Sequence, residues 1–441
     1  MNKKIVFIFF ICLIQFLSIN SIDPNDMEIP SEYVSDTSLL SMISKTPTAV
    51  KTLYVSPNGS GSTCSNSSPC SLSTGVDSLK KGYHLYLKEG TYSVKSGISI
   101  EASGSSGSYI VISSAPNEKA ILTSTKVDSV SLFEIEGSYI IIQNLTFKNV
   151  QAKEVQGIAF YGGGQNHIII RNNVFDSLKT QKINPDFGAN GILLMGEKEK
   201  PIKQVVIYGN RLINNVLGYS EAISVAGNCE EIYVLDNFLS KNTNIGIDFY
   251  GNAGYCSVKK LDQPRKSVAM YNNVEKSNSP YDDCAGIYVD GARDIYVAEN
   301  TITDSQYGIE IGAEERKDDY PVKNIIVKNN ILKDNSVTGI RLGGFDEEDT
   351  GFVQDCDFID NRITGSHEAV IISKAKNINF EGNTMIGMDK YFINMEFSSS
   401  YTKNIEIENN VFSGTGRFVL YSSTKLSLDE FIKKYPSNKK Q

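Results

Sequence analysis

The sequence predicts an all-β protein, a right-handed parallel β-helix in which about ten coils stack into a solenoid. Two interleaved patterns that recur from about residue 140 to residue 412 predict this fold, together with candidate caps at both ends. A single coil of this kind cannot bury its apolar residues alone. Stacking is therefore expected to stabilise the chain, with neighbouring strands about 4.8 Å apart.

The first pattern is a short block with Ile or Val at its second position, followed by one variable and one apolar residue. Nine copies begin at Gly157, Gly191, Ala222, Gly246, Gly286, Gly308, Gly339, Ala369 and Phe392. Their mean spacing is about 29 residues per turn, which is in the range of repeat proteins. Side chains alternate along a strand, so the two apolar residues of each block are expected to point inward and the residue after each to point to solvent.

The second pattern is an Asn followed two residues later by an apolar or near-apolar residue. It occurs at Asn144, Asn173, Asn210, Asn237, Asn273, Asn300, Asn330, Asn361, Asn383 and Asn410. We expect these asparagines to stack at one corner of the coils, where Asn tolerates a left-handed backbone and its amide bonds to the coils above and below. As the first of the series, Asn144 is expected to be buried, so its glycosylation sequon would not be used.

Both ends of the solenoid need a cap, because an open coil exposes unpaired strand edges. Residues 76–79 predict a short N-terminal helix, and Ser427 to Glu430 has the spacing of a capping box that opens a C-terminal helix through Ile432. We assign residues 51–435 to one β-helix domain with its caps. Residues 23–50 are polar and aperiodic, which favours a linker or pro-segment.

Residues 1–22 have the features of a secretory signal peptide, with Lys3 and Lys4 before an apolar run over residues 5–17. That run is shorter than the roughly 20 residues that span a bilayer. We therefore expect a secreted, extracellular protein with no membrane attachment after signal cleavage.

The composition argues against a nucleic-acid partner. The formal net charge is −8, and it falls to −10 once Lys3 and Lys4 are removed. No stripe of Lys and Arg interleaved with aromatic residues is present. Nothing in the sequence indicates an oligomer.

Six cysteines remain after signal cleavage, an even number suited to an oxidising compartment. We predict a local disulfide between Cys64 and Cys70. A second between Cys256 and Cys284 is plausible because both lie in one long insertion, with free buried thiols as the alternative. Asn58 and Asn66 begin glycosylation sequons in the Gly/Ser-rich segment around Cys64, which we expect to be exposed.

The outward residues of the Gly-Ile blocks form two columns of uneven polarity. The nearer column holds Ala159, Leu193, Ser224, Asp248, Tyr288, Glu310, Arg341, Ile371 and Asn394; the farther holds Tyr161, Met195, Ala226, Tyr250, Asp290, Gly312, Gly343, Ser373 and Glu396. Charge is concentrated in four successive coils, which carry Asp248, Tyr250, Tyr288, Asp290, Glu310 and Arg341. The alternative is that these are the ordinary polar outward positions of a solenoid.

Adjacent coils are expected to place Asp290 diagonally next to both Asp248 and Glu310, about 5 to 8 Å away. Three like charges at that distance repel, so one pKa should be raised unless a cation or Arg341 compensates. An insertion of about 35 residues between Tyr250 and Gly286, which includes Lys259, is expected to form one wall of a cleft. The acidic residues at 314–319 and 346–349 are interpreted as solvated loops or as calcium ligands.

Three segments resemble the pectin-lyase-like superfamily of extracellular β-helix proteins over roughly residues 52–432. They are Leu53-Tyr54-Val55-Ser56-Pro57-Asn58-Gly59, the run from Leu85 to Tyr92, and the Gly-Ile blocks. The resemblance implies the fold and an extracellular polysaccharide as partner. It leaves the reaction open, because the superfamily includes lyases, hydrolases and proteins without known activity.

Three functions follow as hypotheses. In glycoside hydrolysis, two of Asp248, Asp290 and Glu310 serve as acid and nucleophile; a carboxyl separation of about 5 Å favours retention and a wider one inversion. The segment from Gly286 to Glu310 resembles β-helix glycosidases that take an Asp and a Glu from successive coils, whereas the Asp-rich motifs of polygalacturonases are absent. This reaction requires no cofactor.

In β-elimination on uronic-acid units, Asp248, Asp290 and Glu310 hold calcium and a basic residue abstracts the proton. No Lys stands on the outward columns of these coils, so the base would be Arg341 or a residue of the insertion such as Lys259.

The third hypothesis is a non-catalytic carbohydrate-binding or surface protein. Tyr161, Tyr250 and Tyr288 would then serve as sugar platforms in a chain without Trp. Tyr250, Tyr288 and Lys259 are the candidate substrate-binding residues.

Overall fold

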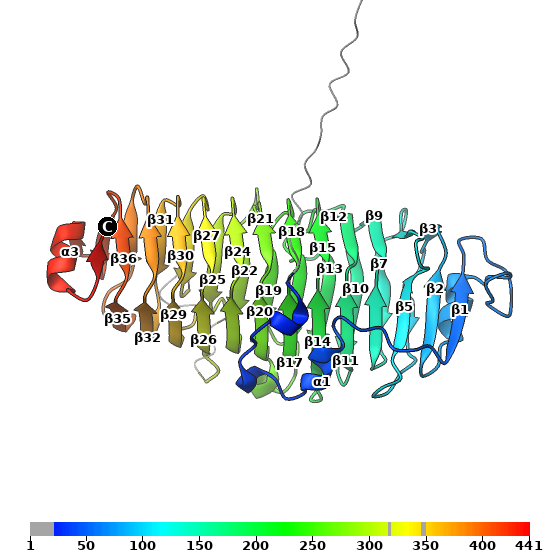
Figure 1. Ribbon diagram of the computed structural model, residues 1–441. Helices are drawn as coiled ribbons and strands as arrows, with labels where there is room; N and C mark the ends of the chain where they lie inside the picture. The colour runs from blue at the N-terminus through cyan, green and yellow to red at the C-terminus, as the bar shows by residue number, and fades with distance from the viewer. Residues whose placement is uncertain (1–21, 316–318, 345–349) are drawn as a thin grey trace, which may run out of the picture.

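The computed structural model describes residues 22–315, 319–344 and 350–441, and these wind into a right-handed parallel β-helix (Figure 1). The chain visits three sheets in turn, and each sheet has thirteen strands in the described ranges. The fold prediction is confirmed. The number of coils exceeds the expected ten because the first coils, before residue 140, lack the Gly-Ile block.

Sheet 1 runs the length of the molecule. It consists of β1 (Lys51–Val55), β2 (Tyr83–Leu87), β5 (Ile110–Ser114), β8 (Ile140–Gln143), β11 (Asn166–Arg171), β14 (Ile202–Tyr208), β17 (Cys229–Leu235), β20 (Arg265–Met270), β23 (Arg293–Ala298), β26 (Val322–Lys328), β29 (Val353–Ile359), β32 (Ala375–Glu381) and β35 (Thr402–Glu408).

Sheet 2 contains the Gly-Ile blocks. It consists of β4 (Ile98–Ile100), β7 (Ser129–Ile135), β10 (Glu154–Gly162), β13 (Ala189–Gly196), β16 (Ile223–Gly227), β19 (Ile247–Tyr250), β22 (Ala285–Asp290), β25 (Tyr307–Gly312), β28 (Thr338–Leu342), β31 (Glu368–Ile372), β34 (Tyr391–Met395), β37 (Arg417–Leu420) and β38 (Thr424–Leu426).

Sheet 3 has the shortest strands. It consists of β3 (Gly90–Ser93), β6 (Ala120–Thr123), β9 (Thr146–Ala152), β12 (Val174–Thr180), β15 (Arg211–Ile213), β18 (Phe238–Ser240), β21 (Asn273–Glu275), β24 (Thr301–Thr303), β27 (Ile331–Lys333), β30 (Arg362–Thr364), β33 (Thr384–Ile386), β36 (Val411–Ser413) and β39 (Lys439–Lys440). Neighbouring strands are parallel throughout the three sheets, except that β37 and β38 are antiparallel.

The interior is filled by stacked apolar side chains, as the repeat predicts. In sheet 2 the isoleucines of successive blocks pair directly, for example Ile247 with Ile287 and Ile287 with Ile309, and all are fully buried. Small residues precede them because the coils approach closely here. A Cβ on Gly246 would lie 2.5 Å from the carbonyl oxygen of Gly286.

Asparagines form a continuous ladder at the corner between sheet 1 and sheet 3. The backbone N–H of each rung donates to the side-chain oxygen of the next, as from Asn300 to Asn330 (3.0 Å), and the side-chain amide reaches the carbonyl of an earlier coil, as from Asn300 to Ala269 (2.9 Å). The rungs are Asn173, Asn210, Asn237, Asn272, Asn300, Asn330, Asn361, Asn383, Asn410 and Asn438.

Two rungs differ from the prediction. Gln143 pairs with Arg171, so Leu145 occupies the rung position and donates to Asn173, while Asn144 is exposed. The expectation that Asn144 is buried is therefore wrong, and the rung near Asn273 is Asn272. From Asn173 to Asn410 the left-handed residue is the one before the rung, for example Asn329 with φ 55°, rather than the rung itself.

Two helices lie at the ends of the solenoid. The C-terminal helix α3 (Leu428–Lys434) is confirmed, with Ser427 and Glu430 forming the predicted capping box, and its Phe431 stacks on Phe418 at 3.7 Å between ring centroids. The N-terminal helix α2 (Leu72–Asp77) begins four residues earlier than expected, because Ser71 provides the N-cap by accepting from the backbone N–H of Thr74.

The segment 22–46, which we call the N-terminal strap, crosses the outer face of sheet 1 (Figure 1). It contains the short helices η1 (Pro24–Asp26), η2 (Ser31–Tyr33) and α1 (Thr37–Ser41). Leu39 and Ile43 of the strap pack on outward apolar residues of sheet 1 such as Ile169. A hydrogen bond of 3.0 Å between Asp36 and His167 fixes it further.

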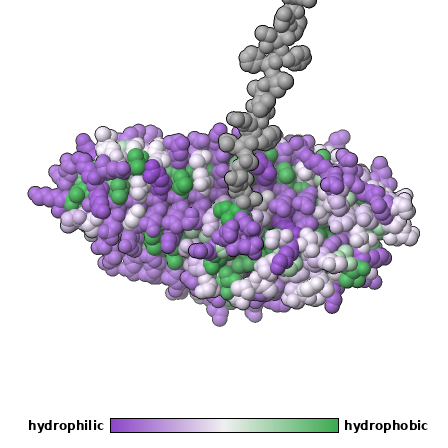
Figure 2. Space-filling view, viewed as in Figure 1, coloured by the Kyte–Doolittle hydropathy of each residue, from purple (hydrophilic) through white to green (hydrophobic). Residues whose placement is uncertain are grey.

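The strap covers a face that would otherwise expose apolar residues. In the view of Figure 2 the surface is mostly hydrophilic, and hydrophobic residues form small separate groups.

Within the described ranges, no helix has the length and apolar character needed to cross a bilayer. The signal peptide prediction lies almost wholly outside the described residues, as do the acidic residues at 346–349.

The predicted disulfide between Cys64 and Cys70 is present, but the one between Cys256 and Cys284 is not. The stretch that holds Cys256 and Cys284 is not a single insertion, because β20 and β21 run through it and leave the two thiols at different corners. Among the described residues, Cys229, Cys256, Cys284 and Cys356 are buried free thiols. Asn58 and Asn66 are exposed.

Candidate functional site

A cavity of about 600 Å³ lies on the outer face of sheet 2, and we call it the acidic cavity. Strands β19, β22 and β25 form its floor, and the loops that precede β13, β16 and β22 and follow β25 form its walls. Its lining consists of Pro185, Tyr219, Glu221, Asn244, Ile245, Asp248, Tyr250, Asp282, Asp283, Tyr288, Asp290, Glu310 and Glu314.

Strand register brings the predicted acids together on this floor. Asp248 pairs with Tyr288, Tyr288 with Glu310, and Glu310 with Arg341, so these four form one column across successive coils. Asp290 follows Tyr288 by two residues on β22 and points to the same face. The predicted register is confirmed.

The exposure of these acids differs from the prediction. Asp248, Asp290 and Glu310 were expected to face solvent, but only 2 to 3% of each residue is exposed. The reason is that loops from neighbouring coils rise above the sheet and enclose the column. The acids therefore line a cavity instead of an open wall.

Burial and mutual repulsion make these carboxyl groups hard to ionise. Burial raises the pKa of Asp248 well above its usual value, and Glu221 and Asp290 add to the effect. Burial and Glu314 do the same for the pKa of Asp290, although its side-chain oxygen accepts a hydrogen bond of 3.0 Å from the backbone N–H of Glu314. One oxygen of Asp248, Oδ1, has no hydrogen-bond partner among the described residues.

Glu310 has the one basic neighbour in the column. Burial raises its pKa to about 8 even though Arg341 opposes the shift, with Nε of Arg341 3.5 Å from Oε1 of Glu310. Arg341 also lies 3.9 Å from Glu396 and over the ring of Tyr307. Arg341 is thus an ion-pair partner at the edge of the site and does not line the cavity.

Glu221 was missed by the sequence analysis. Burial raises its pKa to about 7. Glu221 lies three residues before Ser224, which belongs to the nearer outward column. The bend at the Gly or Ala of each block turns this position toward the same face, so the equivalent residues of successive coils form a third column. The in-register pairs Gln156 with Asn190 and Ala285 with Tyr307 belong to this column. Counting back past the bend would have found it.

The candidate binding residues lie in different surroundings. Tyr250 lines the cavity and is partly exposed. Tyr288 is buried, its hydroxyl lies 3.3 Å from a carboxylate oxygen of Glu314, and Gly312 leaves the room for its ring. Lys259 is exposed on η3 (Lys259–Leu261) and does not line the cavity.

A second hollow of about 440 Å³ adjoins the acidic cavity on the same sheet. The two share Pro185, Tyr219, Glu221 and Tyr250, so they form one groove across the coils from β10 to β25. Aromatic rings of Tyr161 and Tyr255 line this part of the groove.

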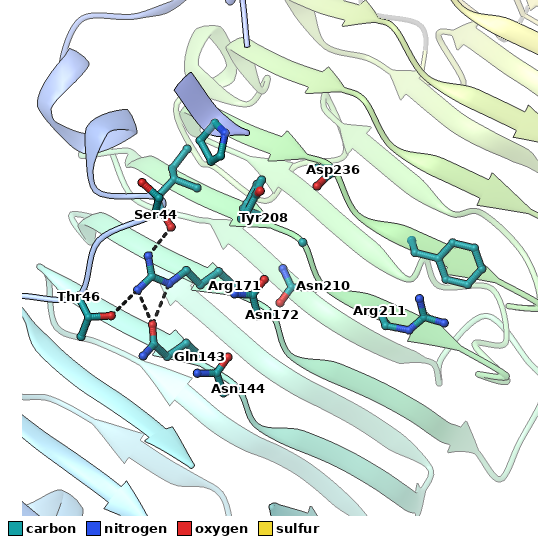
Figure 3. A pocket seen from close by; sticks show the side chains of 14 residues that line it. Ser44, Thr46, Gln143, Asn144, Arg171, Asn172, Tyr208, Asn210, Arg211 and Asp236 are labelled. Carbon is teal, nitrogen blue, oxygen red and sulfur yellow. Dashed lines mark hydrogen bonds between the residues drawn. The ribbon is translucent and has the colours of Figure 1, made fainter. Parts of the chain in front are cut away.

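A further pocket, of about 490 Å³, lies between the strap and sheet 1, on a different face from the groove (Figure 3). Arg171 points into it but is held by the strap. It donates to the backbone oxygens of Met42 and Ile43 and to the hydroxyl of Thr46 (2.8 Å), and to Gln143 beside it. These bonds occupy the guanidinium, so this pocket anchors the strap.

Among the described residues, no three acidic, His or Cys groups lie close enough together to hold one metal ion. The expected calcium ligands Asp248, Asp290 and Glu310 therefore share a cavity without forming a metal cage. Asp318, another candidate from the acidic loops, lies outside the described residues.

Comparison with known proteins agrees with the fold. The family model described as "Pel9A-like, right handed beta helix region" matches residues 53–342, and "Right handed beta helix region" matches residues 268–431. The uncharacterized protein YwoF of Bacillus subtilis (strain 168) is 31% identical over 316 residues, which make up 68% of this chain. The chain spans 65% of that relative's length.

Two solved structures are similar in fold. One is a family 6 polysaccharide lyase from Pseudopedobacter saltans, with a TM-score of 0.55 and 11% identity over 88% of this chain and 91% of that one. The other is a mannuronic acid specific family 6 lyase from human gut microbiota, with a TM-score of 0.52 and 14% identity over 84% and 83%. Since one family model alone covers well over half of its residues, the chain belongs to the Pel9A-like right-handed β-helix family.

Proposed function

We propose that the protein is a secreted, carbohydrate-active β-helix protein that hydrolyses glycosidic bonds of an extracellular polysaccharide. One observation carries the proposal: three buried carboxyl groups with raised pKa values share one cavity in a long groove. Acids of this kind can remain protonated near neutral pH, as a glycosidase's general acid must. The similar polysaccharide lyases support a carbohydrate as substrate.

We assign Glu310 as the general acid. Its pKa of about 8 keeps it protonated at neutral pH, so it can donate a proton to the oxygen of the leaving sugar. We assign Asp290 as the general base because it lines the same cavity as Glu310, on the neighbouring strand. Burial and Glu314 raise its pKa, so it acts as a base only where it is ionised, and the hydrogen bond from the backbone N–H of Glu314 stabilises that form. Asp290 would take a proton from the water that attacks the anomeric carbon.

The stereochemical outcome depends on the distance between the two carboxyl groups, and the spacing of their Cα atoms is compatible with inversion of configuration. Asp290 and Glu310 are one strand and two residues apart, which corresponds to about 8 Å between their Cα atoms. Inverting glycosidases place their carboxyl groups about 6.5 to 9.5 Å apart to leave room for water, whereas retaining enzymes need about 5 Å.

The test is an activity assay on a panel of plant, algal and microbial polysaccharides, with and without EDTA. New reducing ends without unsaturated products indicate hydrolysis, and NMR of the first product reads the anomeric configuration. Glu310→Gln and Asp290→Asn should each lower kcat by about 10²-fold or more. Azide should rescue Asp290→Gly by replacing the water. Full activity in both variants would refute the assignment.

β-Elimination is the second candidate, supported by the lyases among the similar structures. It requires calcium and a base, and the described residues of the cavity supply no metal cage and no Lys or Arg. We therefore derive no elimination step. Unsaturated, EDTA-sensitive product in the same assay would favour this reaction, and retained binding without product would favour a binding protein.

Secretion belongs to the same proposal and rests on the signal-like residues 1–22. N-terminal sequencing of protein recovered from the medium should find a start near residue 23. Retention of the full chain in cells would contradict it.

A further inference from the structure

The groove on sheet 2 has acidic residues along its whole length and no described basic residue in its lining. Neither hollow is lined by a described Lys, Arg or His. The acids that line them are Glu154, Asp186, Glu221, Asp248, Asp282, Asp283, Asp290, Glu310 and Glu314. Such a groove disfavours a polyuronate, because its lining supplies no basic group to pair with the sugar carboxylates and its acids resist further negative charge.

Asp248 gives a more specific indication. Only 3% of this residue is exposed, it lines the cavity, and its Oδ1 has no hydrogen-bond partner among the described residues. A buried acceptor without a donor destabilises the folded protein, and more so when it is charged. The cavity beside it has room for a ligand that brings the missing donor.

Two further acids line the same cavity. Glu221 and Asp290 both act on Asp248 strongly enough to raise its pKa. A cation placed among these three carboxyl groups would form charge-assisted hydrogen bonds and relieve their repulsion. An ammonium group has three donors and matches such a set of acceptors.

We propose that the groove binds a polymer of amino sugars whose amines are free and positively charged, with one ammonium group on Asp248. This inference rests on the proposed function and names its substrate class. The groove crosses six strands, from β10 to β25, which corresponds to about 24 Å and accommodates several sugars. Tyr161, Tyr219 and Tyr255 provide rings on which sugar faces can pack.

Binding is measured by calorimetry at pH 5.5 on the full-length secreted chain that carries Glu310→Gln, which prevents turnover. The probes are a glucosamine hexamer, the N-acetylglucosamine hexamer and a galacturonate hexamer. We expect the glucosamine hexamer to bind at least tenfold more tightly than the other two. The preference should weaken with added salt, because it is electrostatic.

Proton release provides a second readout. An ammonium group favours the ionised form of nearby carboxyl groups, so its binding should release protons from the acids around Asp248. Titrations in buffers of different ionisation enthalpy should therefore detect proton release with the glucosamine hexamer and none with the acetylated hexamer. Absence of release would overturn the placement of the ammonium group.

Asp248→Asn should remove most of the preference for the glucosamine hexamer, and Glu221→Gln should reduce it. The matched control is Glu408→Gln, which removes the same charge from an exposed position on β35. Thermal melts establish that each variant is folded. If Asp248→Asn is folded and keeps the full preference, the inference is wrong.

The outcomes separate this inference from the proposed function. Glu310-dependent hydrolysis of a neutral or acidic polymer, without preference for the glucosamine hexamer, would overturn the inference and leave hydrolysis standing. Tight binding of the glucosamine hexamer without cleavage by the wild-type protein would support the inference and overturn the proposed hydrolysis. If pentalysine binds as tightly as the glucosamine hexamer, the groove is a general cation site and the sugar assignment fails.

Discussion

Glu310 is the residue at which stability and the proposed chemistry are most directly in conflict. Its carboxyl group is buried among other acids, and Arg341 offsets only part of the cost of ionising it. A protonated acid in this position suits general acid catalysis. The same protonation makes the folded state sensitive to pH.

The first prediction concerns that sensitivity. The pKa of Glu310 rises from 4.5 to about 8 in the folded protein, so between these values the folded state binds a proton that the unfolded state does not. The contribution of Glu310 to the free energy of unfolding should therefore be most favourable below about pH 4.5 and fall as pH rises toward 8. Glu310→Gln, which cannot ionise, should be more stable relative to wild type at pH 9 than at pH 5.

Denaturant unfolding between pH 4 and pH 9 measures this difference, with Glu408→Gln as the exposed control. An equal difference between Glu310→Gln and wild type at both ends of the range would contradict the burial argument.

The second prediction concerns the cysteines. Cys229, Cys256, Cys284 and Cys356 are buried free thiols, and burial raises the pKa of Cys229, Cys284 and Cys356 to about 12. Thiolates are the reactive form, so native protein should resist alkylation. Mass spectrometry should find no label on native protein, four labels after denaturation and six after reduction as well. Two labels after denaturation would indicate a second disulfide.

At the scale of elements, contacts at the bends stabilise each coil as well as the hydrogen bonds between its strands and those of neighbouring coils. The asparagine rungs satisfy backbone groups at the bend between sheet 1 and sheet 3, where no strand partner is available. The outward side of sheet 1 depends on the strap in a similar way. Runs such as Ile168 to Ile170 are buried on both faces because the strap covers the outer one.

The third prediction tests the ladder. Asn300→Ala removes the acceptor of two donors of Asn272, its backbone N–H and its side-chain amide, both at 2.9 Å. Leaving these groups buried without partners should lower the free energy of unfolding by about 2 to 4 kcal/mol. Chemical denaturation measures the change. Asn379→Ala, which alters a partly exposed Asn on β32, should cost far less, and equal costs would refute the structural role of the ladder.

At the scale of the whole molecule, the solenoid is a one-dimensional stack whose ends are its weak points. Helix α3 covers the last coil, with Phe431 fully buried against Phe418 and Phe412. Without such a cap the final coil would expose apolar residues and strand edges that can pair with another molecule.

The fourth prediction tests this cap. Phe431→Asp should loosen α3, lower the stability of the last coils by about 3 kcal/mol or more, and promote aggregation. Hydrogen exchange should increase at β36 and β37 and leave β13 to β16 unchanged. Asp429→Asn, in the same helix and exposed, is the control. Uniform loss of protection along the whole chain would contradict the picture of a stack that frays from its end.

Local spacing along the chain was enough to predict several features. The Gly-Ile blocks predicted the register that aligns Asp248, Tyr288, Glu310 and Arg341, because a strand alternates its side chains regardless of its surroundings. The capping box at Ser427 and the disulfide between neighbours Cys64 and Cys70 are local in the same sense.

Tertiary structure alone decided which residues from separate coils meet. It placed Glu221 beside Asp248, separated Cys256 from Cys284, put Leu145 in the place expected for an asparagine rung, and folded the strap onto sheet 1. It also enclosed the acids in a cavity. These outcomes depend on how loops and bends pack against neighbouring coils, and periodicity along one chain does not specify the direction in which a loop leaves its coil.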